Sequence, residues 1–332
     1  MSERVEEEVV VSQAVGALLE PGGVRFRVWA PAHERVEVVL FEGEEPVTSH
    51  LLKREPGGYH AFFLPEVGAG TRYKFRVDGE GPFPDPASRA QPLGVHGPSE
   101  VVDQAFDWTD GEWRGLPLDE LIIYELHVGT ATAEGTFESL VERLDEIKEL
   151  GVTAIELMPV ADFPGERNWG YDGVSLWAPS RAYGRPKALK RLVNAAHERG
   201  LAVLLDVVYN HLGPDGNYLG VYSDYYYNQE RHTPWGAALN FDGPHSAPVR
   251  DFFLANSLYW LREFHFDGLR LDAIHEILDE SERYLLAELV ERVREHIPAD
   301  RHIVLTAEDE RNERALVLPQ RAGGVGLDAV WA

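Results

Sequence analysis

The stretch that decides the fold is residues 202–206, which read AVLLD: four apolar residues in succession, followed by an aspartate. Residues 154–158 (AIELM), 268–272 (GLRLD) and 302–306 (HIVLT) have a similar character. A strand that is apolar on both faces belongs to a buried sheet, and such strands are typical of parallel sheets covered by helices. These segments therefore predict an α/β fold with a parallel sheet.

Amphipathic helices are expected between these strands. Apolar residues recur at helical spacing between residues 140 and 150, and Gly151 follows as a stop signal. A second apolar face covers residues 189–196 and ends before Gly200. Strands that alternate with helices in this way predict a parallel sheet that is either open or closed into a barrel.

Polar residues gather at the carboxyl ends of the predicted strands, and this favours the barrel. They include His127, Asp206, Arg270, Asp272 and Glu308. In a (β/α)8 TIM barrel those ends share one face, which carries the chemistry. An open sheet would more often show a glycine-rich phosphate turn after its first strand, and none is present. With further strands at 121–124 and 328–331, about six strands can be counted. We therefore expect an incomplete barrel.

A different pattern precedes the barrel. Apolar and polar residues alternate at 24–29, 36–40 and 73–77, with a Pro-Gly-Gly turn signal at 56–58. Short alternating strands of this kind predict an antiparallel β-sandwich. We therefore predict three parts along the chain. They are an acidic tail at 1–12, a β-sandwich at 13–110 and a catalytic barrel at 111–332, truncated at its C-terminal end.

Composition excludes several classes of function. The 56 acidic residues outnumber the 31 Lys and Arg, for a formal charge of −25, so nucleic acid and anionic membranes are poor partners. Without cysteine, disulfides and zinc-thiolate sites are impossible. No apolar run approaches the roughly 20 residues that span a bilayer, and the N-terminus lacks the pattern of a signal peptide. A cytoplasmic location is expected.

Two carboxylates suggest the chemistry. Asp272 and Glu308 end consecutive parallel strands, which lie about 4.8 Å apart. Cleavage of a glycosidic bond with retention needs two carboxyl groups about 5 Å apart, one as nucleophile and one as acid/base. Arg270 points to the same side of its strand as Asp272 and should keep it ionised. Glu308 is then expected to carry the proton.

Each of these residues also has a plainer interpretation. A buried Arg270–Asp272 pair can be purely structural, and His211 alone is more often a hydrogen-bonded structural residue. Glu308 begins an acidic run that could be a solvated turn. The convergence of three charged strand ends on one face favours the catalytic interpretation.

Residues 206–211 (DVVYNH), 268–273 (GLRLDA) and 307–309 (AED) resemble, in order, signature regions of the α-amylase superfamily, glycoside hydrolase family 13. The resemblance covers the chain from about residue 121 onward, and the sandwich is similar to the carbohydrate-binding-like N-terminal domains of its members. It implies that Asp272 is the nucleophile, that Glu308 is the acid/base and that Arg270 orients the nucleophile.

The resemblance also implies contacts to the sugar. His211 would bind it, Asp206 would support that subsite, and Tyr171 would stack on it. The substrate-binding residues expected are Trp169, Tyr171, Asp172, Asp206, His211, Tyr218 and His275. Aromatic residues in the long loop after the third strand, including Trp235, are a plausible wall of the reducing-side subsites, unless they only pack that loop.

Two departures from the family pattern stand out. His275 and Glu276 occupy positions at which many amylases have Lys-His. The family's third carboxylate, on the seventh strand, would fall just after Ala332, so these 332 residues alone are expected to be inactive. The segments 168–173 (NWGYDG), 212–218 (LGPDGNY) and 306–312 (TAEDERN) resemble the family members that release trehalose from maltooligosyl trehalose.

Three alternatives remain open: a glucan branching enzyme, a debranching enzyme, and a catalytically dead glucan-binding fragment. The expected partner is maltooligosyl trehalose or a related α-1,4-glucan. No cofactor is expected. No metal is expected either. The α-amylase resemblance implies that Asn210 could be a calcium ligand, as in some amylases, but no other residues complete the six to eight oxygen ligands that are typical of calcium. The oligomeric state expected is a monomer or a weak dimer.

Overall fold

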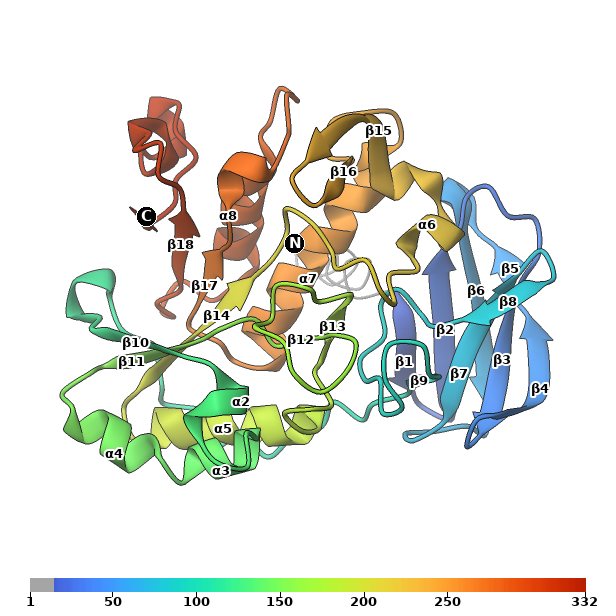
Figure 1. Ribbon diagram of the computed structural model, residues 1–332, viewed down its shortest axis with the longest axis horizontal. Coiled ribbons are helices and arrows are strands. Elements are labelled where there is room, and N and C mark those ends of the chain that lie inside the picture. Colours follow the sequence, from blue (N-terminus) through green and yellow to red (C-terminus); the bar gives the residue numbers. More distant parts are fainter. Residues whose placement is uncertain (1–14) are drawn as a thin grey trace.

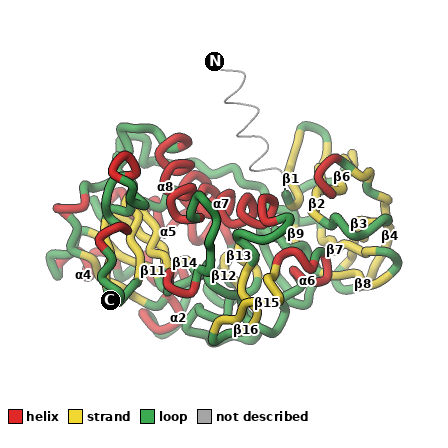
Figure 2. The backbone as a smooth tube through the Cα atoms, turned by 90° about the horizontal axis from the view of Figure 1, so that it is seen from above, coloured by secondary structure: helices red, strands yellow, loops and turns green. Residues whose placement is uncertain are grey.

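Two bodies of β-structure lie side by side, an antiparallel sandwich followed by a curled parallel sheet (Figure 1). This computed structural model describes residues 15–332. The predicted acidic tail at residues 1–12 lies outside the described residues. A view turned by 90° again separates the sandwich from the helix-covered sheet (Figure 2).

The N-terminal domain is a β-sandwich, as the alternating pattern predicts. One sheet has the order β1-β2-β6-β5 and the other β4-β3-β7-β8, with β9 also paired to β7. On β2, Val24, Phe26 and Val28 are buried, whereas Arg25 and Arg27 between them are partly exposed. This alternation gives each strand one face for the shared core. The strands are β1 (Gly16–Glu20), β2 (Gly23–Trp29), β3 (Val36–Glu42), β4 (Glu45–Leu51), β5 (Lys53–Arg54), β6 (Tyr59–Pro65), β7 (Arg72–Val77), β8 (Glu80–Phe83) and β9 (Ser99–Glu100).

The second domain is a six-stranded parallel sheet that curls like part of a barrel (Figure 1). Its strand order, β10-β11-β14-β17-β18-β19, follows the sequence. The strands are β10 (Ile123–Leu126), β11 (Ala154–Leu157), β14 (Ala202–Val207), β17 (Gly268–Leu271), β18 (Val304–Glu308) and β19 (Ala329–Trp331). Strands β11, β14 and β17 are buried along their whole length. The prediction of an incomplete TIM barrel is therefore confirmed.

Helices cover this sheet and share one core with it. Leu189 and Leu192 of α5, Leu258 of α7 and Leu289 of α8 pack in the same buried cluster as the strand residue Leu205. The α-helices are α2 (Val128–Ala131), α3 (Phe137–Val141), α4 (Leu144–Glu149), α5 (Pro186–Glu198), α6 (Leu219–Tyr222), α7 (Ser246–Glu263) and α8 (Leu285–His296). Two small hairpins, β12 (Ala161–Asp162) with β13 (Ser175–Pro179) and β15 (Tyr227–Thr233) with β16 (Gly236–Leu239), project from the strand ends. Single-turn 3-10 helices are η1 (Pro56–Gly58), η2 (Leu118–Glu120), η3 (Asp224–Tyr226), η4 (Ile274–Glu276), η5 (Arg314–Leu316) and η6 (Gln320–Ala322). Within residues 15–332, no helix is both long enough and apolar enough to cross a membrane.

The loop after β14 joins the two domains. Tyr222 is fully buried in the core of the sandwich, and its hydroxyl donates to the backbone oxygens of Phe83 (3.0 Å) and Pro84 (2.7 Å). His96 of the sandwich bonds the Tyr218 hydroxyl at 2.7 Å. Because buried hydrogen bonds and apolar packing both cross this boundary, the sandwich fixes the loop that borders the ends of the strands.

A buried histidine fastens the segment between the domains to the barrel. The ring of His197, on α5, bonds Asp110 through Nδ1 (2.8 Å) and Asp267 through Nε2 (2.9 Å). Two carboxylate acceptors require an N–H on both ring nitrogens, and therefore a protonated ring. Burial opposes that charge, but the hydrogen bonds from Asp110 and Asp267 outweigh burial and raise the pKa of His197.

His197→Gln is expected to lower the free energy of unfolding by about 3 kcal/mol at pH 6, because two buried carboxylates lose the cation that they share. The folded-state pKa of His197 is raised, so its stabilisation is complete below the unfolded value of about 6.5 and is lost as pH rises through the folded value. Denaturant unfolding of wild type and variant at pH 6 and pH 9 measures this. The control is His265→Gln, since His265 bonds Asp110 alone and is more exposed. An equal deficit at both pH values would contradict the charged ring.

Candidate active site

Charged side chains from three neighbouring strands meet at the carboxyl ends of the sheet. Asp206 on β14 and Arg270 on β17 are direct partners in the parallel register. Arg270 Nη1 donates to Asp206 Oδ2 at 2.7 Å and to Asp272 Oδ1 at 2.9 Å. Its Nη2 forms an ion pair with Glu308 Oε2 of β18 at 3.0 Å. One guanidinium therefore gathers all three carboxylates that the sequence singles out.

Asp272 is held from two sides. Asn210 donates from Nδ2 to Asp272 Oδ2 (2.9 Å) and to the Asp272 backbone oxygen (2.8 Å). The carboxylate is thus fixed between Arg270 and Asn210, and its side chain is only 11% exposed. The side chain of Glu308 is 35% exposed. One member of the pair is therefore enclosed and immobilised, whereas the other reaches solvent.

The backbone after Asp272 contributes a hydrogen bond to Glu308. Ala273 lies in the left-handed region, with φ 39° and ψ 55°, which a residue with a Cβ adopts only at a cost of about 1–2 kcal/mol. In this conformation its N–H donates to Glu308 Oε2 at 3.0 Å. The turn that follows β17 thus links the two carboxylates through the backbone as well as through Arg270.

Burial sets the protonation of the cluster. Burial raises the pKa of Asp206 to about 7, against the opposing charge of Arg270. It also raises the pKa of Asp272, whereas the hydrogen bond from Asn210 and the charge of Arg270 oppose that shift. The pKa of Arg270 moves up rather than down, because the nearby carboxylates outweigh its burial. The guanidinium is therefore a permanent cation at the centre of the site.

Tyr171 and His211 border the carboxylates. The Tyr171 hydroxyl donates to Asp206 Oδ2 at 3.0 Å. His211 bonds the Tyr171 backbone oxygen through Nε2 at 2.8 Å and also contacts Asn210 Oδ1 through Nδ1. Burial lowers the pKa of His211, and the hydrogen bond to Tyr171 opposes this shift. Trp235 stacks on the His211 ring, with the ring centres 4.4 Å apart and the planes 13° apart, so the hairpin β15–β16 covers this side.

Comparison with known proteins identifies the family of this chain. Residues 103–258 match the family described as "Alpha amylase, catalytic domain", and residues 13–93 match "Carbohydrate-binding module 48 (Isoamylase N-terminal domain)". The malto-oligosyltrehalose trehalohydrolase of Saccharolobus solfataricus is 45% identical over 317 residues, which is 95% of this chain and 54% of that protein. The chain belongs to the α-amylase family, glycoside hydrolase family 13.

Other members of the family extend the comparison. The malto-oligosyltrehalose trehalohydrolase of Deinococcus radiodurans is 46% identical, over 96% of this chain and 50% of that protein. A crystal structure from Salmonella typhimurium, provisionally named an alpha amylase, has a TM-score of 0.88 at 42% identity, over 96% of this chain and 53% of its own. A pullulanase from Paenibacillus barengoltzii has a TM-score of 0.76 at 28% identity, over 89% of this chain and 52% of its own. The chain spans about half the length of the curated relatives it matches.

Within residues 15–332, the other residues predicted from the α-amylase resemblance are not hydrogen-bond or ion-pair partners of Arg270. Asp172 accepts a hydrogen bond from Asn168 Nδ2 (3.1 Å), and Trp169 is 78% exposed. Tyr218 packs against the sandwich, where it contacts Phe83 and His96. Of the aromatic loop residues, Tyr222 and Tyr226 are buried, whereas Trp235 is half exposed beside the site. The loop therefore both packs against itself and borders the carboxyl end of the sheet.

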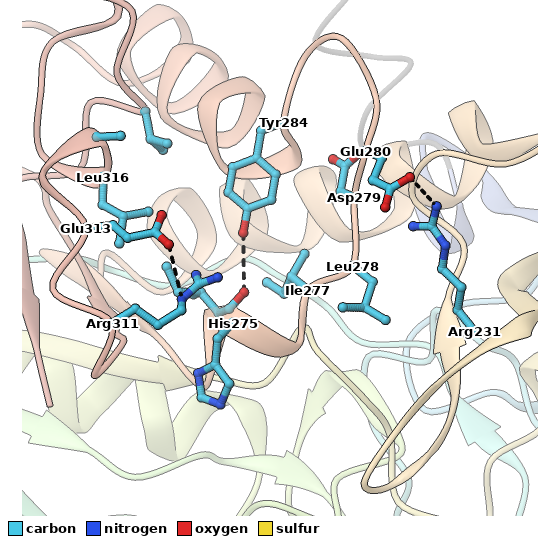
Figure 3. Close-up of a pocket in the computed structure, with 13 residues that line it drawn as sticks. Arg231, His275, Ile277, Leu278, Asp279, Glu280, Tyr284, Arg311, Glu313 and Leu316 are labelled. Carbon is cyan, nitrogen blue, oxygen red and sulfur yellow. Dashed lines mark hydrogen bonds and ion pairs between the residues drawn. The ribbon is translucent and has the colours of Figure 1, made fainter.

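His275 lines a pocket of about 340 Å³. Figure 3 shows its walls: the Tyr284 hydroxyl donates to the Ile274 backbone oxygen (3.3 Å), Arg311 pairs with Glu313, and Arg231 of the hairpin pairs with Glu280 (2.8 Å). Its lining combines aliphatic side chains, such as Ile277 and Leu316, with charged groups, Tyr284 and His275. A mixed lining of this kind suits a sugar, which has both apolar faces and hydroxyl groups.

Some functional contacts have weak signals in the sequence. The α-amylase resemblance suggests for Asn210 only the role of a calcium ligand. In the structure, Asn210 donates a hydrogen bond to Asp272. The signal for this contact in the sequence is the position of Asn210 four residues after Asp206, within the same motif. Two groups in residues 15–332 bring three possible metal ligands within 4.8 Å, namely His275 with Asp309 and Glu310, and Glu125 with Glu156 and Asp206. Asp309 is already paired with Arg311. The absence of a metal requirement stays a prediction.

Proposed function

We propose that the complete protein is a retaining α-glycoside hydrolase that cleaves the α-1,4 bond next to the terminal trehalose of maltooligosyl trehalose. The observation that carries the mechanism is the guanidinium of Arg270, which binds both Asp272 and Glu308 on adjacent strands. Adjacent strands lie about 4.8 Å apart, and a retaining pair needs about 5–5.5 Å between its carboxyl groups.

The roles follow from the surroundings of each carboxylate. Asp272, fixed by Arg270 and Asn210, attacks the anomeric carbon while Glu308 protonates the departing glycosidic oxygen. A covalent glycosyl–enzyme bond forms at Asp272. Glu308 then takes a proton from water, which displaces Asp272 and restores both groups. Arg270 and the Ala273 N–H hold the two carboxylates in place throughout.

The choice of trehalose as the released unit rests on the relatives. Those from Saccharolobus solfataricus and Deinococcus radiodurans carry the name malto-oligosyltrehalose trehalohydrolase. The pocket that His275 lines includes Ile274, two residues after Asp272, and is our candidate for the site of the trehalose unit. The hairpin that carries Trp235 and Arg231 would then close the space between the two.

The test is product analysis with the complete protein on maltotriosyl trehalose and, separately, on amylose. Free trehalose from the first substrate and little action on the second are expected. New α-1,6 branches, or general amylolysis, would replace the trehalose proposal by a branching or amylolytic function. A protein that binds both glucans and cleaves neither would favour the non-catalytic alternative.

A further inference from the structure

A further buried carboxylate, Glu156, lies beneath the site, on a strand that none of the proposed roles uses. Glu156 is in β11, paired in register with Glu125 of β10 and with Leu204 of β14. Leu204 and Asp206 share one face of β14 because side chains alternate along a strand. Glu156 therefore faces the same side of the sheet as Asp206, two residues nearer the amino ends of the strands. One oxygen each from Glu125, Glu156 and Asp206 lie within 4.8 Å of one another.

These buried carboxylates have more oxygen atoms than hydrogen-bond donors around them. Glu156 has no exposed surface, and neither of its oxygens has a hydrogen-bond partner within the described residues. The same holds for Asp206 Oδ1, since Arg270 and Tyr171 both bond Oδ2. An ionised carboxylate that is buried without donors costs several kcal/mol, and a second negative charge beside it adds to that cost. Arg270 is already shared among Asp206, Asp272 and Glu308.

We propose that Glu156 is a positioning residue that holds one proton against Asp206, so that Asp206 stays ionised and keeps Tyr171 and Arg270 in place. The neutral acid is a donor, and Asp206 Oδ1 is an acceptor without a partner among the described residues. The two carboxyl groups are near enough for this, since one oxygen of each lies within 4.8 Å of the other. Arg270 is then left to serve Asp272 and Glu308. This inference rests on the proposed function for its catalytic meaning, but the proton itself can be tested without substrate.

The charges around Glu156 support the neutral form. The groups that act on it are Asp206 on β14, Glu125 on β10 and Arg270 on β17. Burial raises the pKa of Glu156 to about 8; Asp206 adds to the shift, and Arg270 opposes it. A divalent cation is the other way to join three carboxylates. These residues offer one oxygen each within the cluster, whereas calcium takes six to eight, so a proton is the better fit.

The first test is the pH dependence of unfolding for wild type, Glu156→Gln and Glu125→Gln. A carboxyl whose pKa is raised in the folded state stabilises fully below its unfolded value, near 4.5, and loses that contribution as pH rises to about 8. The midpoint of denaturation is therefore expected to fall less steeply with pH in Glu156→Gln than in wild type. Glu125→Gln, an exposed neighbour, should follow wild type.

Parallel profiles for wild type and Glu156→Gln would overturn the proposal, as would a Glu125→Gln profile like that of Glu156→Gln. Calcium or magnesium that raises the melting temperature of wild type but not of Glu156→Gln would also overturn it, in favour of a cation.

The second test uses the activity of the complete protein. Glu156→Leu removes the donor and should lower kcat by about tenfold or more with KM little changed. Glu156→Gln, which keeps a neutral donor, should restore most of the rate and alter the alkaline side of the pH profile. A Leu variant as active as wild type would overturn the positioning role. If wild type releases no trehalose, the proposed function fails, while the unfolding profiles still decide the proton on Glu156.

Discussion

Asp272→Asn is expected to reduce kcat for trehalose release by about 10⁴-fold or more, because an amide cannot form the glycosyl–enzyme bond. The variant should fold, since Asn can still accept from Arg270 at the position of Oδ1. Steady-state kinetics on maltotriosyl trehalose with the complete protein measures the loss. Undiminished activity would remove Asp272 from the mechanism.

Glu308→Gln provides the matched comparison. It should also be nearly inactive on maltotriosyl trehalose, because the leaving sugar needs a proton. With a substrate whose leaving group departs without protonation, such as a glycosyl fluoride, the first step should recover in Glu308→Gln but not in Asp272→Asn. A covalent intermediate should then accumulate, detectable by mass spectrometry of the intact protein. Equal rescue of both variants would contradict the assignment of the two roles.

Arg270→Met is expected to have the largest effect on stability, about 3–5 kcal/mol lost at pH 7. The variant leaves Asp206 and Asp272 buried without the cation that both contact. Denaturant unfolding at pH 5 and pH 8 should show a smaller deficit at pH 5, because protonation of these carboxylates removes the uncompensated charge. Burial raises the pKa of both carboxylates, that of Asp206 to about 7, so the relief at Asp206 begins near neutral pH.

A matched control separates this effect from the loss of any arginine. Arg311 also pairs with a buried aspartate, Asp309, but its own side chain is 42% exposed. Arg311→Met should therefore destabilise much less, since water can replace the guanidinium. A deficit in Arg270→Met that is equal at the two pH values would mean that lost packing, rather than uncompensated charge, dominates.

The parallel sheet could be predicted from the sequence because its strands are unusually simple. The only charged residues in segments 202–206 and 268–272 are Asp206, Arg270 and Asp272. The structure places Asp206 and Arg270 in direct register. Asp272 and Glu308 could be singled out because they follow or end the buried strands β17 and β18. A charge at the end of a buried strand is costly unless a partner or a ligand compensates for it. The roles of these residues remain predictions.

Other features depend on packing that periodicity does not encode. The helix predicted around residues 140–150 is divided into α3 and α4, and Leu150, counted on its apolar face, is 67% exposed. Trp235 reaches His211 only because the hairpin β15–β16 folds back over the strand ends. Glu156 is visible in the sequence as a single charged residue inside an apolar strand. That it lies near Asp206, however, depends on the register in which β11 pairs with β14.

The strand order of the sheet implies an order of events during synthesis. The six strands of the parallel sheet follow one another in the sheet in the order in which they occur in the chain, so a nascent polypeptide can add them one at a time. Asp206 leaves the ribosome 64 residues before Arg270, an interval of about 3–13 s at about 5–20 residues per second. Until Arg270 arrives, β14 is expected to remain a hydrated edge that pairs more readily with β17 than with other strands. Docking of β17 would then bring in the cation and expel water in one step.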